Sequence, residues 1–146
     1  MGMDLSGAGG YFRWNFGEWG DLLELAQAYG WKPMGTGPPR GMKKAEWGEG
    51  TYFSNEGQLF YARDAKALAD ALERAVLALA NETAANQPAK VPKTRKAHKL
   101  DHFLAAITGK NKPKKGRIAV QSFSPKDLLY ICGFIDYCRE GSFRIY

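Results

Sequence analysis

The sequence predicts an α+β fold in a single domain, on three observations. A chain of 146 residues matches the commonest domain size of ~100–150 residues. Hydrophobic residues make up 45% and charged residues 25% of the chain, proportions typical of a protein with a folded core. Strand and helix patterns alternate without the βαβ rhythm of a parallel sheet. We therefore expect one domain over residues 1–146, with mixed short strands, three to four helices and a long basic linker in the second half.

The first thirty residues predict a strand and a helix behind a flexible leader. Residues 1–10 contain four glycines and few apolar side chains, so we expect them to be flexible or to form a loop. Tyr11–Phe16 alternates aromatic residues on one face, which is typical of a strand. Helical spacing of apolar residues follows from about Glu18 to Tyr29, and Gly30 stands where a helix-ending glycine belongs.

The middle of the chain predicts a loop, a hairpin and a long helix. Residues 31–50 hold five glycines and three prolines, so no regular element can run through them. Thr51–Phe53 and Gln58–Tyr61 are the predicted strands of a hairpin, joined by a turn that ends in Asn-Glu-Gly. Asp64 is the expected N-cap of a helix over about Ala65–Asn81, which is rich in alanine and leucine.

The second half predicts a linker followed by further short elements. Residues 82–97 lose all periodicity and carry two prolines, which indicates a basic, mobile linker or loop within the domain. A short helix is predicted over about His98–Thr108 and a strand over Arg117–Phe123. Ser-Pro-Lys-Asp is a strong start for a helix over Ser124–Arg139, and the alternating tail Ser142–Tyr146 predicts a terminal strand.

The positive charge of the chain is concentrated in one stretch. The net charge is +6, yet the segment from Lys90 to Arg117 alone carries ten basic residues and one acid, and the remainder carries eleven basic residues and fourteen acids. Such a local field attracts phosphate backbones, anionic lipid or an acidic protein face, although charge runs are often only solvated surface. The ten basic residues, all candidate binding residues, are Lys90, Lys93, Arg95, Lys96, Lys99, Lys110, Lys112, Lys114, Lys115 and Arg117.

The cysteines and the hydropathy pattern indicate a cytoplasmic protein with no membrane segment. Cys132 and Cys138 lie six residues apart in a predicted helix, about 9 Å along its axis, which is beyond the ~7 Å that a disulfide can bridge. We expect both to be reduced and buried. No apolar run approaches the ~18–20 residues that span a bilayer.

No residue pattern predicts an enzyme, a metal site or a cofactor. His98 and His102 have the spacing of two metal ligands on one helix face, but lysines flank them and no further ligand is evident, so we interpret them as surface histidines. The glycine run Gly7–Gly10 precedes a strand instead of following one, which is the wrong order for a phosphate-binding loop. Carboxylate pairs such as Asp70 with Glu73 have the spacing of ordinary helix-surface acids.

Two tryptophans are further candidate binding residues. Trp31 and Trp47 flank or lie within the loop rich in glycine and proline, and they are the aromatic residues that a regular core explains least. Aromatic residues of this kind are enriched at binding hot spots. The alternative is that they are part of the core, where large aromatic side chains are usually found.

Three segments resemble a group of small, uncharacterised bacterial proteins that share this order of segments. They are WGDLLELAQAYGWKPMGT (Trp19–Thr36), SNEGQLFYARDAKALADALERAV (Ser54–Val76) and FIDYCREGSFRIY (Phe134–Tyr146). The resemblance covers about a third of the chain. It implies a bacterial or phage origin in the cytoplasm, with no activity, cofactor or site residue, and it does not extend to the long basic insertion between the second and third segments.

These observations lead to a non-enzymatic binding protein that acts by protein–protein contact, with an acidic protein surface as its expected partner. The alternative is a nucleic-acid-binding protein that uses Lys90–Arg117, because phosphate contacts by lysines give salt-sensitive affinity. A small-molecule enzyme is a third hypothesis, which would need a deep pocket of converging ionisable groups. The oligomeric state and the identity of the partner stay open.

Overall fold

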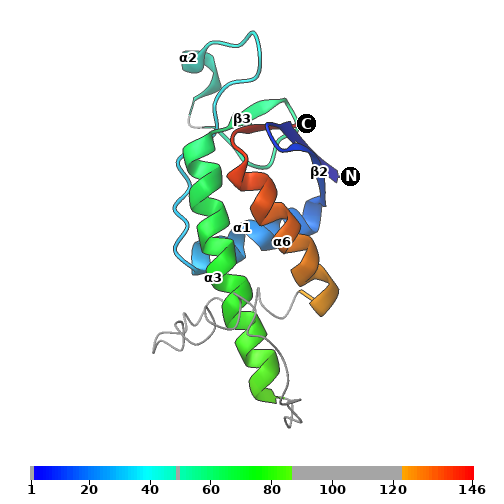
Figure 1. The fold of residues 1–146 in the computed structure, drawn as a ribbon. Helices are drawn as coiled ribbons and strands as arrows, with labels where there is room; N and C mark the ends of the chain where they lie inside the picture. Colours follow the sequence, from blue (N-terminus) through cyan, green and yellow to red (C-terminus); the bar gives the residue numbers. More distant parts are fainter. Residues whose placement is uncertain (1, 49, 87–122) are drawn as a thin grey trace.

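A four-stranded antiparallel sheet with helices on one face gives this protein an α+β fold, as predicted (Figure 1). The computed structural model describes residues 2–48, 50–86 and 123–146. The strand order is β2-β1-β4-β3, with every neighbouring pair antiparallel. The strands are β1 (Gly2–Gly7), β2 (Gly10–Asn15), β3 (Gln58–Phe60) and β4 (Phe143–Ile145).

Alternate residues of the strands build the core. On β1, Met3 and Leu5 are fully buried, whereas Asp4 and Ser6 between them are not. The same alternation runs through the other strands, because successive side chains of a strand point to opposite faces of the sheet. The buried strand residues lie in one hydrophobic cluster with residues of the helices, and they are Met3, Leu5, Trp14, Phe60, Phe143 and Ile145.

Strand β1 corrects the prediction of a flexible leader over residues 1–10. It lies inside the sheet, where Leu5 pairs with Phe12 on one side and with Ile145 on the other. Its glycines serve close packing instead of mobility. A Cβ atom on Gly7 would lie closer than 3.0 Å to the backbone of Ser142 and Phe143. Local composition could not reveal this, since the partner strand β4 comes from the other end of the described chain.

Helix α1 (Phe16–Ala28) forms close to where the sequence predicts it. Phe16, which the pattern assigned to the strand, begins the helix instead, because the side chain of Asn15 caps it by accepting a hydrogen bond from the Gly17 N–H at 3.3 Å. The predicted glycine ending is confirmed, since Gly30 has a φ of +101°.

The segment between α1 and the long helix is only partly as predicted. The irregular loop over residues 31–50 contains a single short helix, α2 (Lys44–Trp47). The hairpin prediction is wrong, because Thr51–Phe53 is not a strand. Strand β3 pairs with β4 instead. On its other side, β3 contacts the loop through one isolated bridge between Leu59 and Gly37. The side chain of Gln58 holds Thr51 in place by donating to its carbonyl oxygen at 3.1 Å.

Helix α3 (Ala62–Asn86) is longer than predicted at both ends. Asp64 lies within its first turn instead of capping it, because its carboxylate is engaged by side chains from the preceding loop. Residues 82–86, predicted as the start of the linker, are helical. The remainder of the predicted linker, the helix over His98–Thr108 and almost all of the strand over Arg117–Phe123 lie outside the described residues.

Helix α6 (Pro125–Arg139) and strand β4 confirm the predictions for the end of the sequence. Ser124 and Asp127 form a capping box, with Ser124 N–H donating to the Asp127 carboxylate at 2.6 Å and Asp127 N–H donating to Ser124 Oγ at 3.4 Å. Five residues of α6 are buried: Ile131, Phe134, Ile135, Tyr137 and Cys138. Both cysteines are free, as expected, although Cys132 is only half-buried.

Among the described residues, no helix lies on the second face of the sheet. Helices α1, α3 and α6 all lie on the side of the sheet that carries the core, and α2 projects from the other elements on its loop (Figure 1). Residues Asp4 and Tyr146 exchange both backbone hydrogen bonds, at 3.0 and 2.7 Å, so the two ends of the chain lie side by side. In the described part of the chain, no helix is long and apolar enough to cross a membrane.

Candidate binding face of the sheet

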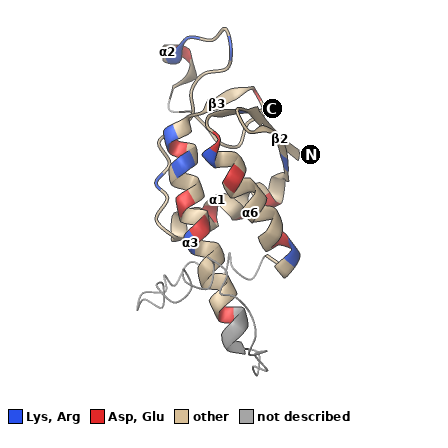
Figure 2. Ribbon diagram, in the orientation of Figure 1, with Lys and Arg blue, Asp and Glu red and all other residues tan. Residues whose placement is uncertain are grey.

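The described residues include only two of the binding residues predicted from the sequence, Trp31 and Trp47. All ten basic residues of Lys90–Arg117 lie outside the described residues. Within the described part, Lys and Arg residues are spread over several elements, including α2, the beginning of α3 and both ends of α6 (Figure 2).

Trp31 belongs to the core, which corrects the expectation that a regular core does not explain it. Its side chain is 3% exposed, and its ring lies 5.4 Å from Tyr52 and 6.3 Å from Phe60. Its indole N–H donates to Asp64 at 2.8 Å. Tyr52 donates to the other carboxylate oxygen of Asp64 at 2.6 Å and accepts from the Gly35 N–H at 2.7 Å. Trp31 therefore anchors the loop to α3.

Burial governs the ionisation of Asp64 and Tyr52. Burial raises the pKa of Asp64, an effect that the hydrogen bonds from Tyr52 and Trp31 oppose. Burial and the contact with Asp64 also raise the pKa of the Tyr52 hydroxyl. Asp64 is closed off from solvent and accepts hydrogen bonds at both oxygens, so its role is structural.

Trp47 is half-buried at the end of α2. Its indole N–H donates to the carbonyl and hydroxyl oxygens of Thr36, each at 3.1 Å. Because this polar atom is already engaged within the loop, the ring fastens α2 to the backbone near Thr36.

The strand residues that point away from the core form a surface that we call the open face. None of them is buried. The open face is defined by Asp4, Ser6, Tyr11, Arg13, Arg144 and Tyr146.

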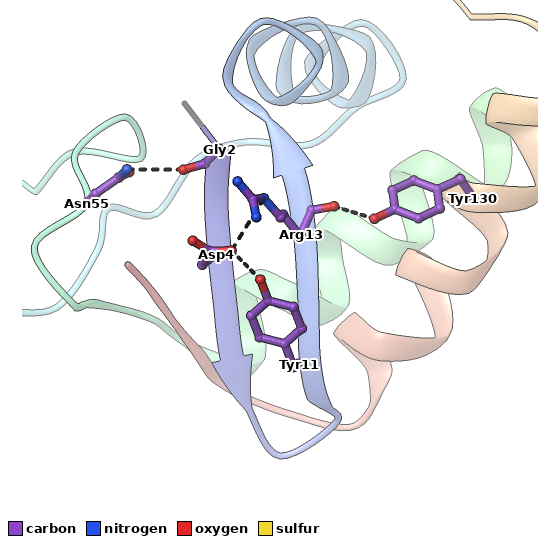
Figure 3. A network of polar contacts seen from close by, with 6 residues as sticks. All are labelled: Gly2, Asp4, Tyr11, Arg13, Asn55 and Tyr130. Atoms are coloured by element: carbon purple, nitrogen blue, oxygen red, sulfur yellow. Dashed lines mark hydrogen bonds and ion pairs between the residues drawn. The ribbon is translucent and has the colours of Figure 1, made fainter.

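A carboxylate at the centre of the open face holds two of its side chains. The Tyr11 hydroxyl donates to Asp4 Oδ1, and Arg13 Nε lies 3.6 Å from the same oxygen (Figure 3). The hydrogen bond to Asp4 raises the pKa of Tyr11. Tyr11 is 63% exposed, so its ring is presented to solvent with its hydroxyl already fixed by a neighbour.

The strand β4 side of the face carries a second arginine and a second tyrosine. Arg144 Nη1 donates to the carbonyl oxygens of Gly57 and Pro38 at 2.7 and 3.3 Å. Among the described residues it has no carboxylate within ion-pair distance. Tyr146 packs beside Gly57 and remains 46% exposed. The face therefore offers two guanidinium groups and two phenol rings around one carboxylate.

Contacts at its margins keep the open face in place. The Tyr130 hydroxyl from α6 donates to the carbonyl oxygen of Arg13, on the outer edge of the sheet, and Asn55 Nδ2 donates to the carbonyl oxygen of Gly2 at 3.2 Å (Figure 3). These bonds link β1 and β2 to α6 and to the loop before β3. The face is consequently supported from both sides.

The sequence contained a signal for this face. Because Phe12 and Trp14 alternate toward the core, Tyr11 and Arg13 between them had to share the opposite face. That Asp4 and Arg144 also belong to the open face could not be predicted from the sequence, because they join it only when β1 pairs with β2 and β4.

The described residues offer little to acid–base or metal chemistry. They contain no group of three or more His, Cys, Asp or Glu that could hold a metal ion. Asp70 and Glu73 face Arg139, whose Nη2 lies 3.5 and 2.8 Å from their carboxylate oxygens, as ordinary surface acids do. Burial raises the pKa of the Cys138 and Cys132 thiols, which disfavours the reactive thiolate.

No protein-family model, curated protein or solved structure shows significant similarity to the chain.

Proposed function

We propose that this protein is a non-enzymatic interaction protein that binds an acidic surface of a partner protein through the open face. The observation that carries the proposal is the combination of Tyr11, Arg13, Arg144 and Tyr146 on a sheet surface that no described helix covers. Tyrosine and arginine are the residue types most enriched at binding hot spots.

The electrostatics of the open face favour an acidic partner. Two arginines lie on it against one acid, and Asp4 is already engaged by Tyr11 and Arg13. An incoming carboxylate would meet Arg144, which has no ion-pair partner among the described residues. Because Tyr11 and Arg13 are held in position beforehand, ordering them on binding costs less entropy.

The same geometry favours a protein over a nucleic acid on this face. A folded acidic surface can place its carboxylates opposite Arg13 and Arg144 and away from Asp4, whereas the evenly spaced phosphates of a nucleic-acid backbone would bring one against Asp4.

A photo-crosslinking experiment tests the proposal. A benzophenone amino acid replaces Tyr11 in the full chain, and in a matched control it replaces Leu129, which is 77% exposed on α6. We expect position 11, and not position 129, to trap one protein at stoichiometric yield in bacterial extract. Arg13→Gln with Arg144→Gln should abolish the product, and Lys66→Gln with Lys126→Gln should preserve it.

Two outcomes would overturn the proposal. One is the absence of a dominant protein product at position 11; the other is a product that survives the change of both open-face arginines in a variant with a native circular dichroism spectrum. A nucleic acid trapped at position 11 would assign the face to the other class of partner.

Nucleic-acid binding by Lys90–Arg117 is a second candidate function, favoured by the +9 charge of that segment in the sequence. Labelled single- and double-stranded oligonucleotides titrated at low and high salt test it. Changing Lys112, Lys114 and Lys115 to alanine should flatten the salt dependence. A lack of binding at low salt would remove this candidate.

The proposed setting is the cytoplasm of a bacterium, with a bacterial or phage gene as the source. Support comes from two free cysteines, since reducing compartments keep thiols unpaired, and from the resemblance of three segments to small bacterial proteins.

A further inference from the structure

A groove lies on the helical side of the molecule, away from the open face. It has a volume of about 510 Å³, which is within the ~300–1,000 Å³ range of ligand sites. One wall comes from α1 and includes Asp21 and Glu24, and the floor and other wall come from the loop and include Trp31, Tyr52 and Phe53. Glu24 and Phe53 are exposed, so the groove opens to solvent.

The aromatic floor of the groove is rigid. Trp31 and Tyr52 both donate to the buried carboxylate of Asp64, at 2.8 and 2.6 Å. The Trp19 indole N–H from α1 donates to the carbonyl oxygen of Tyr52 at 2.8 Å, so the helix and the loop are tied together under the groove. A site that is already formed loses little entropy when it binds.

Aromatic surface continues from the floor to the rim. Phe53 is 50% exposed, and its ring lies 6.5 Å from that of Phe16, which is also exposed, at an interplanar angle of 66°. Exposed aromatic pairs of this kind provide apolar area for an alkyl chain and π faces for a cation.

The wall that α1 provides carries two acidic side chains, Asp21 and Glu24. Asp21 and Glu24 are three residues apart on α1, a spacing that puts them on one side of a helix. Neither has an ion-pair partner among the residues that the structure describes. Two carboxylates without an ion-pair partner in the described part of the chain, beside an aromatic floor, complement a side chain with an apolar stem and a cationic end.

We propose that this groove binds a segment of a partner protein that carries lysine or arginine next to an apolar residue. The cationic ends pair with Asp21 and Glu24, while the alkyl stems lie on Phe53 and the edge of Trp31. The inference is independent of the proposed function, because the groove and the open face are different surfaces with opposite charge preferences.

Peptide binding to the full chain tests this proposal. The probe is a fluorescein-labelled peptide of alternating lysine and leucine, and the matched probe has glutamate in place of lysine. We expect the lysine peptide to raise the fluorescence anisotropy with an affinity that falls as salt is added, and the glutamate peptide to leave it unchanged.

Variants of the groove locate the binding. Asp21→Asn with Glu24→Gln should weaken the lysine peptide at least about fivefold, the loss of two exposed ion pairs. The matched control, Asp136→Asn on α6 with Glu140→Gln directly after it, changes two exposed acids and should keep the affinity within about twofold. Phe53→Ala should also weaken it, whereas Tyr11→Ala with Arg13→Gln on the open face should have no effect.

Any of three results would overturn the inference: no binding of the lysine peptide, equal binding of the glutamate peptide, or an equal loss in the groove and control variants. A change confined to the open-face variant would show that the peptide binds there. Circular dichroism of each variant shows whether the fold is retained.

Discussion

Two pairs of tyrosine and aspartate illustrate how differently the interior and the open face use the same chemistry. In the interior, Tyr52 donates to Asp64, and both residues are buried. On the open face, Tyr11 donates to Asp4, and both remain accessible to solvent. The donors and acceptors are identical in type, so the contrast comes from the surroundings alone.

Burial decides what each pair does. Water cannot replace a lost partner inside the core, so an unmatched polar group there costs its full desolvation energy. At the surface, water replaces it readily, and exposed ion pairs contribute little to stability. The interior pair therefore holds the fold together, whereas the open-face pair contributes little to stability and leaves both residues accessible to solvent.

Removal of the interior carboxylate should have the largest effect. Asp64→Ala leaves the Trp31 indole N–H and the Tyr52 hydroxyl without their acceptor, at about 1–3 kcal/mol for each group. Urea unfolding measures the loss. Asp136→Ala, which removes an exposed carboxylate from α6, is the control and should change the free energy of unfolding by less than about 0.5 kcal/mol. An equal effect of the two variants would contradict the comparison.

Neighbouring residues of β1 provide the next contrast. Leu5→Ala opens a cavity in the core and should lower the free energy of unfolding by about 2–5 kcal/mol, because Leu5 is fully buried. Ser6→Ala, one residue later on the exposed side, should stay within about 0.5 kcal/mol of the wild type. Chemical denaturation of both variants measures the two changes in the free energy of unfolding. A small loss for Leu5→Ala would mean that β1 is not part of the core.

The pH dependence of stability should reveal the interior carboxyl group. Burial raises the pKa of Asp64 in the folded protein above the value of about 3.9 in an unfolded chain. The contribution of its neutral form is therefore fully present below about pH 3.9 and is lost as the pH rises through the folded pKa. Asp64→Asn does not titrate there.

The free energy of unfolding of the wild type, relative to Asp64→Asn, should consequently increase as the pH falls from about 7 to about 4. Urea unfolding of both proteins across this range measures the difference, and other titrating groups cancel between them. A difference that decreases on acidification would show that the hydrogen bonds from Tyr52 and Trp31 outweigh burial.

The smallest effect should come from the open face. Asp4→Ala removes the acceptor of Tyr11 and the ion-pair partner of Arg13, yet we expect the free energy of unfolding to change by less than about 0.5 kcal/mol. Thermal and urea unfolding measure it. A loss comparable to that of Asp64→Ala would place Asp4 in the structural framework and remove the contrast between the two pairs.

The sequence predicted the elements whose signals are local. Helix α6 begins directly after its cap Ser124 because the cap, the proline and Asp127 all lie within four residues, and α1 ends shortly before Gly30 for a similarly local reason. Strand β4 was predicted from its own alternation. No long-range contact was needed for any of these.

Elements that depend on distant partners were missed. β1 looks like a glycine-rich leader until β2 and β4 are placed on either side of it. Asp64 has the sequence context of an N-cap, but its partners Trp31 and Tyr52 come from a loop with no periodicity. The open face was missed for the same reason, because Asp4 and Arg13 meet only when β1 pairs with β2, and Arg144 joins them only when β4 pairs with β1.

The position of β4 between β1 and β3 has a consequence for protein synthesis. Leu5 can find its partner Ile145 only after the long stretch of sequence between them has been synthesised, and closing so long a loop is entropically unfavourable and slow. Without β4, the apolar residues Met3 and Leu5 of β1 have a neighbouring strand on one side only, and an isolated two-stranded hairpin is marginally stable at best. Completion of the sheet is thus a late step, in which β4 is inserted between β1 and β3.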